Sequence, residues 1–190
     1  LNFAPLVHRI KCGKIEDRTT IDCFVINGPQ TYFGSAVELV LKDLYISYTE
    51  FPNIRKMLKS GEKPVERNLL SGTLSVQKIN GKGISEAEYR EAIGTIADFF
   101  SFARGSRCGF GHSVGKDQQG QVCFTELGFT RADDIRGEHG WSDLEVVSFY
   151  PKIFQLLTEA KNSLDEPVLK PALEFYRVSN SIRSTSAEMA

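Results

Sequence analysis

In the first third of the chain, apolar residues recur at every second position, which is the pattern of a half-buried β-strand. Three stretches have this pattern, and they begin at Ile21, Val37 and Leu70. Within residues 37–48 the apolar phase changes at Lys42 and Asp43. One extra residue in a strand has this effect, so the pattern predicts a β-bulge or a sharp bend at these two residues.

A long helix is predicted over about residues 85–104. Ser85 and Glu88 have the spacing of a capping box, in which each side chain binds the free backbone N–H of the other residue. The apolar positions that follow have the spacing of one helix face: Tyr89, Ile93, Ile96, Ala97, Phe100 and Ala103. Gly105 is a natural C-terminal stop.

The second half begins with residues 104–120, which are rich in glycine and polar side chains and predict a loop or a loose hairpin. Residues 121–129 return to the composition of a strand. A second capping box starts at Ser142, and Pro151 is expected in the first turn of a further helix. A last helical pattern begins near Pro171.

The order of elements is strands, helix, strand and then helices. This order predicts an α+β fold, with a mainly antiparallel sheet packed by one long helix (about 85–104) and followed by a C-terminal helical section. We expect an α+β domain over residues 1–141 and a helical section over residues 142–190.

Composition narrows the class of protein. Of the 190 residues, 41% are hydrophobic and 25% are charged, as in ordinary globular proteins. The formal net charge of -1 provides no overall attraction to nucleic acid or to an anionic membrane. Apolar runs are too short to cross a membrane. The four cysteines are Cys12, Cys23, Cys108 and Cys123, and no two of them have C-x-x-C spacing. We therefore expect reduced thiols and a cytoplasmic location. The chain starts at Leu1 and not at a methionine, so we expect a piece of a longer protein.

Residues 104–112 are the candidate ligand-binding stretch. They contain Arg104, Arg107, His112 and three glycines. Glycine lets a backbone come close to a ligand, and the arginine fork matches a phosphate or a carboxylate. Arg104 and Arg107 could converge on one anion, such as a nucleotide or RNA phosphate. Alternatively, the two arginines stabilise the C-terminus of the preceding helix, where the dipole favours cations, and the glycines serve the turn.

The remaining polar residues predict neither a metal site nor a bound cofactor. His139 and Glu138 stand together, but no H-x-x-x-H or H-E-x-x-H pair occurs in the chain. Cys108 follows Arg107 and is either a reactive thiolate or a buried, inert thiol. No arrangement of these residues identifies a catalytic mechanism.

Two stretches resemble a known group of bacterial proteins. Residues 99–105 look like the end of a helix in N-terminal domains that precede a HEPN-like helical region. Residues 173–180, with Ala187 and Glu188 shortly after, are similar to the opening helix of that region. The group includes the ApeA-like proteins of antiviral defence against phages. In these proteins the helical domain is regarded as the ribonuclease and the preceding part as the sensor.

The resemblance implies a non-catalytic sensor or recognition module that regulates a downstream helical domain of the same chain, with a nucleotide, an RNA or a protein as its ligand. Arg107 and His112 have the R-x4-6-H spacing of HEPN ribonucleases, but Gly109 and Gly111 disfavour a helix there. The final helical pattern has no such motif, so no catalytic residue is transferred. The alternatives are an enzyme that acts on a phosphate-bearing substrate through residues 104–112, and a purely structural fragment.

Overall fold

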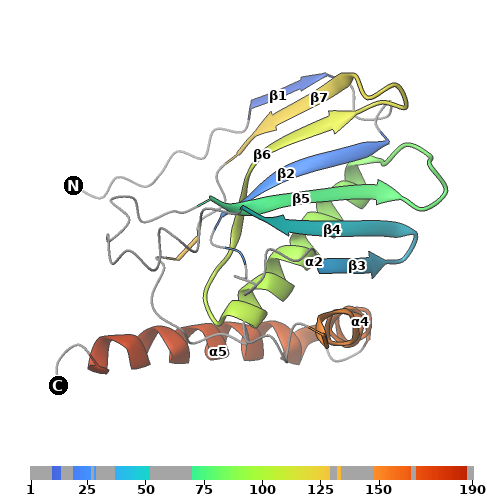
Figure 1. The fold of residues 1–190 in the computed structure, drawn as a ribbon. Helices are drawn as coiled ribbons and strands as arrows, with labels where there is room; N and C mark the ends of the chain where they lie inside the picture. The colour runs from blue at the N-terminus through green and yellow to red at the C-terminus, as the bar shows by residue number, and fades with distance from the viewer. Residues whose placement is uncertain are drawn as a thin grey trace.

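The computed structural model describes residues 10–13, 19–26, 28, 37–51, 70–128, 132–133, 148–163 and 166–187, to which every structural statement below refers. The elements along the chain are β1 (Ile10–Gly13), β2 (Thr20–Ile26), β3 (Val37–Leu41), β4 (Leu44–Glu50), β5 (Leu70–Lys78), α2 (Glu86–Arg104), β6 (Gly109–Lys116), β7 (Val122–Leu127), α4 (Tyr150–Lys161) and α5 (Glu166–Ala187). The strands form one sheet in the order β1-β7-β6-β2-β5-β4-β3, and all neighbours are antiparallel. The predicted α+β class with an antiparallel sheet is confirmed (Figure 1).

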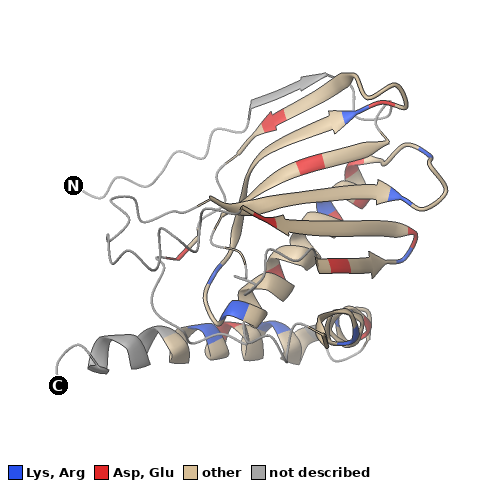
Figure 2. Cartoon of the chain, viewed as in Figure 1, with Lys and Arg blue, Asp and Glu red and all other residues tan. Residues whose placement is uncertain are grey.

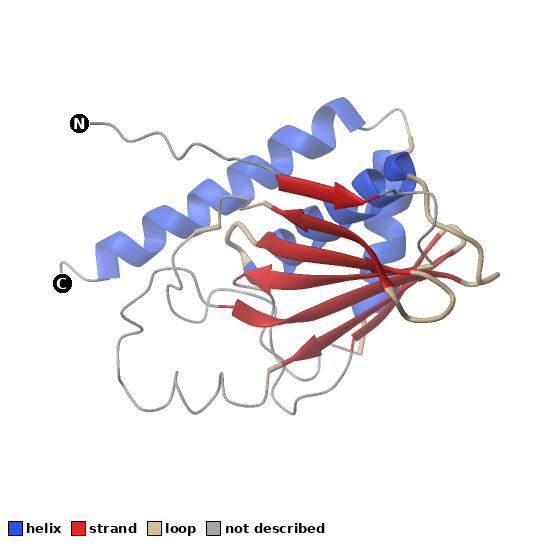
Figure 3. Ribbon diagram, turned by 90° about the horizontal axis from the view of Figure 1, so that it is seen from above, coloured by secondary structure: helices blue, strands red, loops and turns tan. Residues whose placement is uncertain are grey.

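The helices lie on one face of the sheet (Figures 1 and 3). Strand β2 shows how the sequence selects that face. Ile21, Cys23 and Val25 are buried, whereas Asp22 and Phe24 between them are only half-buried. Since successive side chains of a strand point to opposite faces, the buried set faces the helices and the other set faces away. The predicted alternation is confirmed in this strand.

Two helices supply fully buried aromatic rings to the core. Phe99 and Phe100 belong to α2, and Tyr150 and Phe154 belong to α4. The Phe99 ring meets both α4 rings edge to face, with centroid separations of 5.4 Å to Tyr150 and 5.2 Å to Phe154. These residues share one hydrophobic cluster with the strands. The sheet is therefore packed by α2 and α4 together and not by the single helix that the sequence predicts.

Helix α2 begins and ends as its sequence predicts. The Ser85 backbone N–H donates to Glu88 Oε2 at 2.8 Å, and the Glu88 N–H donates to Ser85 Oγ at 3.3 Å, so both halves of the capping box are formed. At the other end Gly105 has a φ of 74°, the left-handed conformation that ends many helices.

The change of phase at Lys42 and Asp43 is a hairpin turn, so the predicted β-bulge is wrong, whereas the predicted sharp bend is present as a full reversal of the chain. Leu41 pairs with Leu44 across the turn, and the two strands run antiparallel. Both leucines face the core although they are three residues apart, because the chain reverses between them. Lys42 has a φ of 55°, a conformation usually marked by Asn or Gly, so the usual hairpin signal is missing from the sequence.

Strands β4 and β5 approach closely at Gly72. A Cβ atom at this position would overlap the backbone carbonyl oxygen of Thr49 and the ring of Tyr48. The adjacent Ser71 hydroxyl accepts a hydrogen bond from the Gly28 N–H at 2.7 Å and donates to the Val25 carbonyl at 3.2 Å. Ser71 therefore joins the end of β5 to the end of β2.

The C-terminal helices follow the sequence prediction in part. Pro151 lies in the first turn of α4, as predicted. Helix α5 begins at Glu166, so Pro171 lies inside it and not at its start. The predicted capping box at Ser142 and the predicted boundary between residues 141 and 142 lie outside the described residues.

Candidate functional site

The candidate stretch is not a loop. Residues 109–116 form β6, which pairs with β2 on one side and β7 on the other. Of the predicted loop or loose hairpin over residues 104–120, the hairpin is formed by β6 and β7, and only residues 105–108 and 117–120 lie outside a helix or strand. Glycine disfavours strands, but pairing on both sides and packing against α2 determine the local structure here. One such contact is the 2.8 Å hydrogen bond from the Tyr89 hydroxyl to Ser113 Oγ.

Arg104 points into the protein. In the last turn of α2, its Nε donates to Ser106 Oγ at 2.9 Å and its NH1 donates to the Gly28 carbonyl at 3.1 Å. Burial lowers the pKa of this guanidinium from its usual value. The nearby Tyr48 and Cys108 side chains oppose this effect. Arg104 thus connects the end of α2 to the chain beyond β2, which is the structural role considered in the sequence analysis.

Arg107 lies in the connection between α2 and β6 and points toward α5. Its NH2 donates to Glu174 Oε1 at 3.1 Å, and both side chains are partly exposed, by 36% and 48%. Its backbone is fixed separately by Asp133: the Arg107 N–H donates to Asp133 Oδ2 at 2.8 Å, and the Asp133 N–H donates to the Arg107 carbonyl at 2.9 Å. The position of Arg107 therefore does not depend on its guanidinium.

His112 lies on the face of the sheet that points away from the helices. Its ring is stacked on Phe24, with a centroid separation of 5.9 Å and an interplanar angle of 29°. The Phe24 ring also contacts the Phe51 ring, with a centroid separation of 6.2 Å. The imidazole is thus separated from Arg104 by the thickness of the sheet.

The three predicted ligand-binding residues do not form one site. Arg104 binds backbone and hydroxyl oxygens inside the protein, Arg107 binds Glu174, and His112 stacks on the opposite face. The two arginines do not converge, because the chain turns between them at Gly105.

A cluster that sequence reasoning missed lies where α2 ends against α5. Glu174 is bridged by Arg107 from one side and by Arg177 from the other. Figure 2 shows basic residues of α2 and α5 brought close together at this junction. The available signal was the spacing of Lys170, Glu174 and Arg177, which places all three on one side of a helix. That signal did not show that Arg107 would join them.

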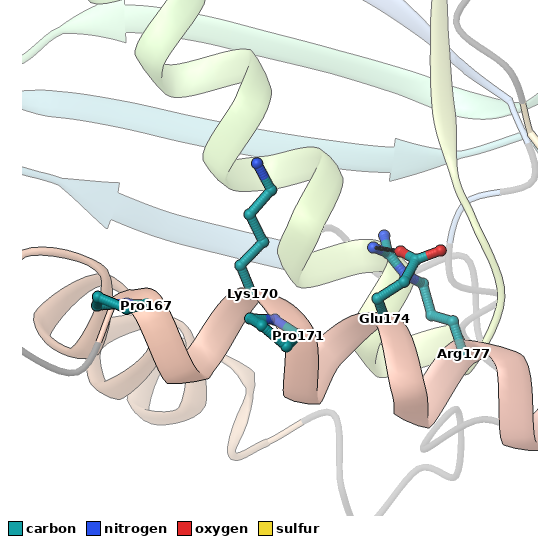
Figure 4. A pocket seen from close by; sticks show the side chains of 5 residues that line it. All are labelled: Pro167, Lys170, Pro171, Glu174 and Arg177. Carbon is teal, nitrogen blue, oxygen red and sulfur yellow. Dashed lines mark hydrogen bonds and ion pairs between the residues drawn. The ribbon is translucent and has the colours of Figure 1, made fainter.

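This side of α5 lines a pocket of about 510 Å³, shown in Figure 4. The described residues that line it are Pro167, Lys170, Pro171, Glu174 and Arg177. The Lys170, Glu174 and Arg177 side chains extend to the same side of α5, toward α2. Arg177 Nε is buried and has no hydrogen-bond partner in the part of the chain that the structure describes.

The cysteine beside this cluster is not a nucleophile in this structure. Cys108 is 2% exposed, and burial raises the pKa of its thiol to about 12. Arg104 and Arg177 act in the opposite direction but do not offset burial. Of the two interpretations of Cys108, the structure supports the buried, inert thiol.

Within the described parts of the chain, no three His, Cys, Asp or Glu side chains are grouped so that they could hold a metal ion. His139 and Glu138 lie outside those parts. None of the described helices is both long enough and apolar enough to cross a membrane. Comparisons with protein-family models, with curated proteins and with solved structures find no significant match.

Proposed function

We propose that this chain is a non-catalytic recognition module of a cytoplasmic bacterial defence protein, and that α5 couples it to a helical effector domain of the same protein. In this proposal the sheet with α2 and α4 is the body of the sensor, and α5 is the first helix of the effector. Support comes from the contacts of α5 and from the resemblance of residues 173–180 to the opening helix of HEPN-like domains.

The observation on which the proposal rests is that α5 has two apolar sides. On one side Leu169 and Leu173 pack against the core. The Tyr176 ring of the same side lies 5.4 Å from that of Phe102, between centroids. On the other side Val168 and Phe175 are 70% and 75% exposed. These two residues are two helical turns apart and therefore lie on the same side of the helix.

An exposed apolar side of this kind is suited to a second layer of helices. A helix that is apolar on two sides is stable when both sides are covered. Phe175 is the best anchor for such a contact, because an aromatic ring buries a large area when it packs. A helical effector domain supplies apolar residues of matching geometry and is the partner that the resemblance implies.

The alternative enzyme has less support. It needs Arg104, Arg107 and His112 around one substrate, and these side chains point in three different directions. Its arginines bind protein groups, and its imidazole stacks on Phe24. A reaction that uses all three would require the sheet and the end of α2 to rearrange.

The first test is to read the coding sequence that follows the codon for Ala190. A helical domain with an R-x4-6-H motif is expected there. A stop codon directly after Ala190 would overturn the proposal.

The second test uses that longer protein and compares Phe175→Glu with Leu156→Glu. Leu156 is 55% exposed on α4 and controls for the introduction of a charge at an exposed apolar position. Phe175→Glu should change the RNA-cleaving activity of the effector, whereas Leu156→Glu should leave it as in the parent. Equal effects of the two changes, or no effect of either, would contradict the role of α5.

A further inference from the structure

The pocket on α5 has the size of a ligand site, and the described residues that line it belong to this one helix. Its volume of about 510 Å³ lies within the range of about 300–1,000 Å³ that is typical of small-molecule sites. Lys170, Glu174 and Arg177 extend to the same side of the helix, toward α2 (Figure 4). Arg107 reaches the same carboxylate from the connection between α2 and β6.

The charges around the pocket are unbalanced. Among the described residues, the three cations of Arg107, Lys170 and Arg177 outnumber the two carboxylates of Glu174 and Asp133, which leaves a local charge of +1. Lys170 forms no ion pair with any residue that the structure describes. The buried Nε–H of Arg177 has no acceptor among the described residues. A buried donor without an acceptor is rare in folded proteins, and it indicates that a further acceptor belongs here.

Glu174 shows which chemistry the pocket accepts. Its two carboxylate oxygens bind two different guanidinium groups, Oε1 that of Arg107 and Oε2 that of Arg177. A carboxylate is planar and a phosphate is tetrahedral, but each presents a pair of oxygens that arginine can bind through two parallel hydrogen bonds. A phosphate has more charge and more oxygen acceptors than a carboxylate.

From these observations we infer that the pocket binds the phosphate group of a small molecule. The phosphate takes Arg177 and Lys170 as its ligands and competes with Glu174 for the guanidinium groups. Pro167 and Pro171 form the apolar part of the lining, beside the position of the phosphate.

Binding has a mechanical consequence, which rests on the proposed function. Glu174 connects α5 to the end of α2 through Arg107. A phosphate that competes with Glu174 for Arg107 changes this connection and therefore the position of α5. The binding itself does not depend on the role of α5 and is tested separately.

The test is isothermal titration of the 190-residue chain at low salt with inorganic phosphate, adenosine 5′-monophosphate and adenosine. Both phosphate compounds should bind and adenosine should not. Equal affinities for the two would identify the phosphate group alone as the ligand, and tighter binding of the monophosphate would identify a nucleotide. Binding should weaken as sodium chloride is added, because salt screens the attraction between partly exposed charges.

Three variants make the test specific. Lys170→Ala should weaken binding about tenfold or more, because it removes one charge-assisted contact. Lys152→Ala is the matched control, since Lys152 is an exposed lysine of α4 outside the pocket. Glu174→Gln should strengthen binding several-fold, because the amide keeps the shape of the side chain but no longer competes for the arginines.

Three results would overturn the phosphate site. One is a lack of binding by either phosphate compound up to about 10 mM, a concentration that fills most of even a millimolar site. The second is an equal effect of Lys170→Ala and Lys152→Ala. The third is weaker binding after Glu174→Gln. None of these results concerns the exposed side of α5. The proposed recognition module is therefore tested separately, by comparing Phe175→Glu with Leu156→Glu.

Discussion

Arg104→Ala tests whether this arginine is a structural or a ligand-binding residue. The change removes the hydrogen bonds of a charged donor to the Gly28 carbonyl at 3.1 Å and to Ser106 Oγ at 2.9 Å. Hydrogen bonds from charged groups contribute about 1.5–3 kcal/mol, and a buried carbonyl left without its donor costs about 1–3 kcal/mol. The two effects overlap, so we expect the free energy of unfolding to fall by about 2–4 kcal/mol.

Arg107→Ala is the matched control, three residues further along the chain. Its ion pair with Glu174 is partly exposed on both sides, and such pairs contribute about 0–1 kcal/mol. The hydrogen bonds of its backbone to Asp133 survive the change. Urea denaturation of both variants and the parent measures the two losses, provided that the slope m is unchanged. Equal losses below about 1 kcal/mol would refute the structural role of Arg104.

Three further predictions concern the core and α2. Phe100→Ala should lower the free energy of unfolding by about 3–5 kcal/mol because the ring is fully buried, whereas Ser85→Ala should lower it by only about 1 kcal/mol through the lost cap. Chemical denaturation compares the two variants, and equal small losses would contradict the assignment of the helix face. Gly72→Ala should destabilise the fold by about 1–3 kcal/mol, because the new methyl group overlaps β4, whereas Gly94→Ala at an open helical position should stabilise it by about 0.5–1 kcal/mol. Thermal melting should therefore show a lower melting temperature for the first variant and a higher one for the second. The Lys78 ammonium and the Ser85 cap lower the pKa of Glu88 from 4.5 to about 2, so this carboxylate stabilises the fold fully above about pH 4.5 and loses that effect as the pH falls toward 2. In Glu88→Gln, the loss of stability between these pH values should be less steep in acid denaturation, and a profile like that of the parent would contradict the role of Glu88.

Elements with local signals could be predicted from the sequence. The capping box of α2, its stop at Gly105 and the alternation in β2 depend on residues close to one another in the chain. Strand β6 could not be predicted in the same way. Its composition favours a loop, and it is a strand because β2 and β7 bind it on both sides. These partners are set by the topology and not by the composition of β6.

The candidate site, like the fold, could be predicted only where the signal is local in the sequence. The sequence correctly marked the end of α2 as rich in cations, and it offered stabilisation of the helix end as one role for Arg104. It could not show that the Gly28 carbonyl, 76 residues away, would receive that guanidinium. The partner of Arg107 was equally hidden, because Glu174 lies 67 residues further along the chain. Contacts over such separations depend on how α2 packs against the sheet and against α5.

The two C-terminal helices are attached to the sheet with different strength. Helix α4 inserts Tyr150 and Phe154, each only 1% exposed, into the aromatic core. Helix α5 packs through the partly buried Leu169 and Leu173 and through a partly exposed ion pair. Buried apolar area is the main source of stability, so α5 can separate from the body at a lower free energy than α4.

In the proposed function, this difference makes α5 the element that a ligand would move. A bound ligand shifts an equilibrium only by its difference in affinity for the two states, and that difference is typically a few kcal/mol. Such an amount is too small to remove two buried aromatic rings from the core, but it is comparable to the contribution of a partly exposed ion pair. The ion pair between Arg107 and Glu174 is therefore the contact at which ligand binding would act on α5, while Arg104 keeps the end of α2 fixed to the sheet.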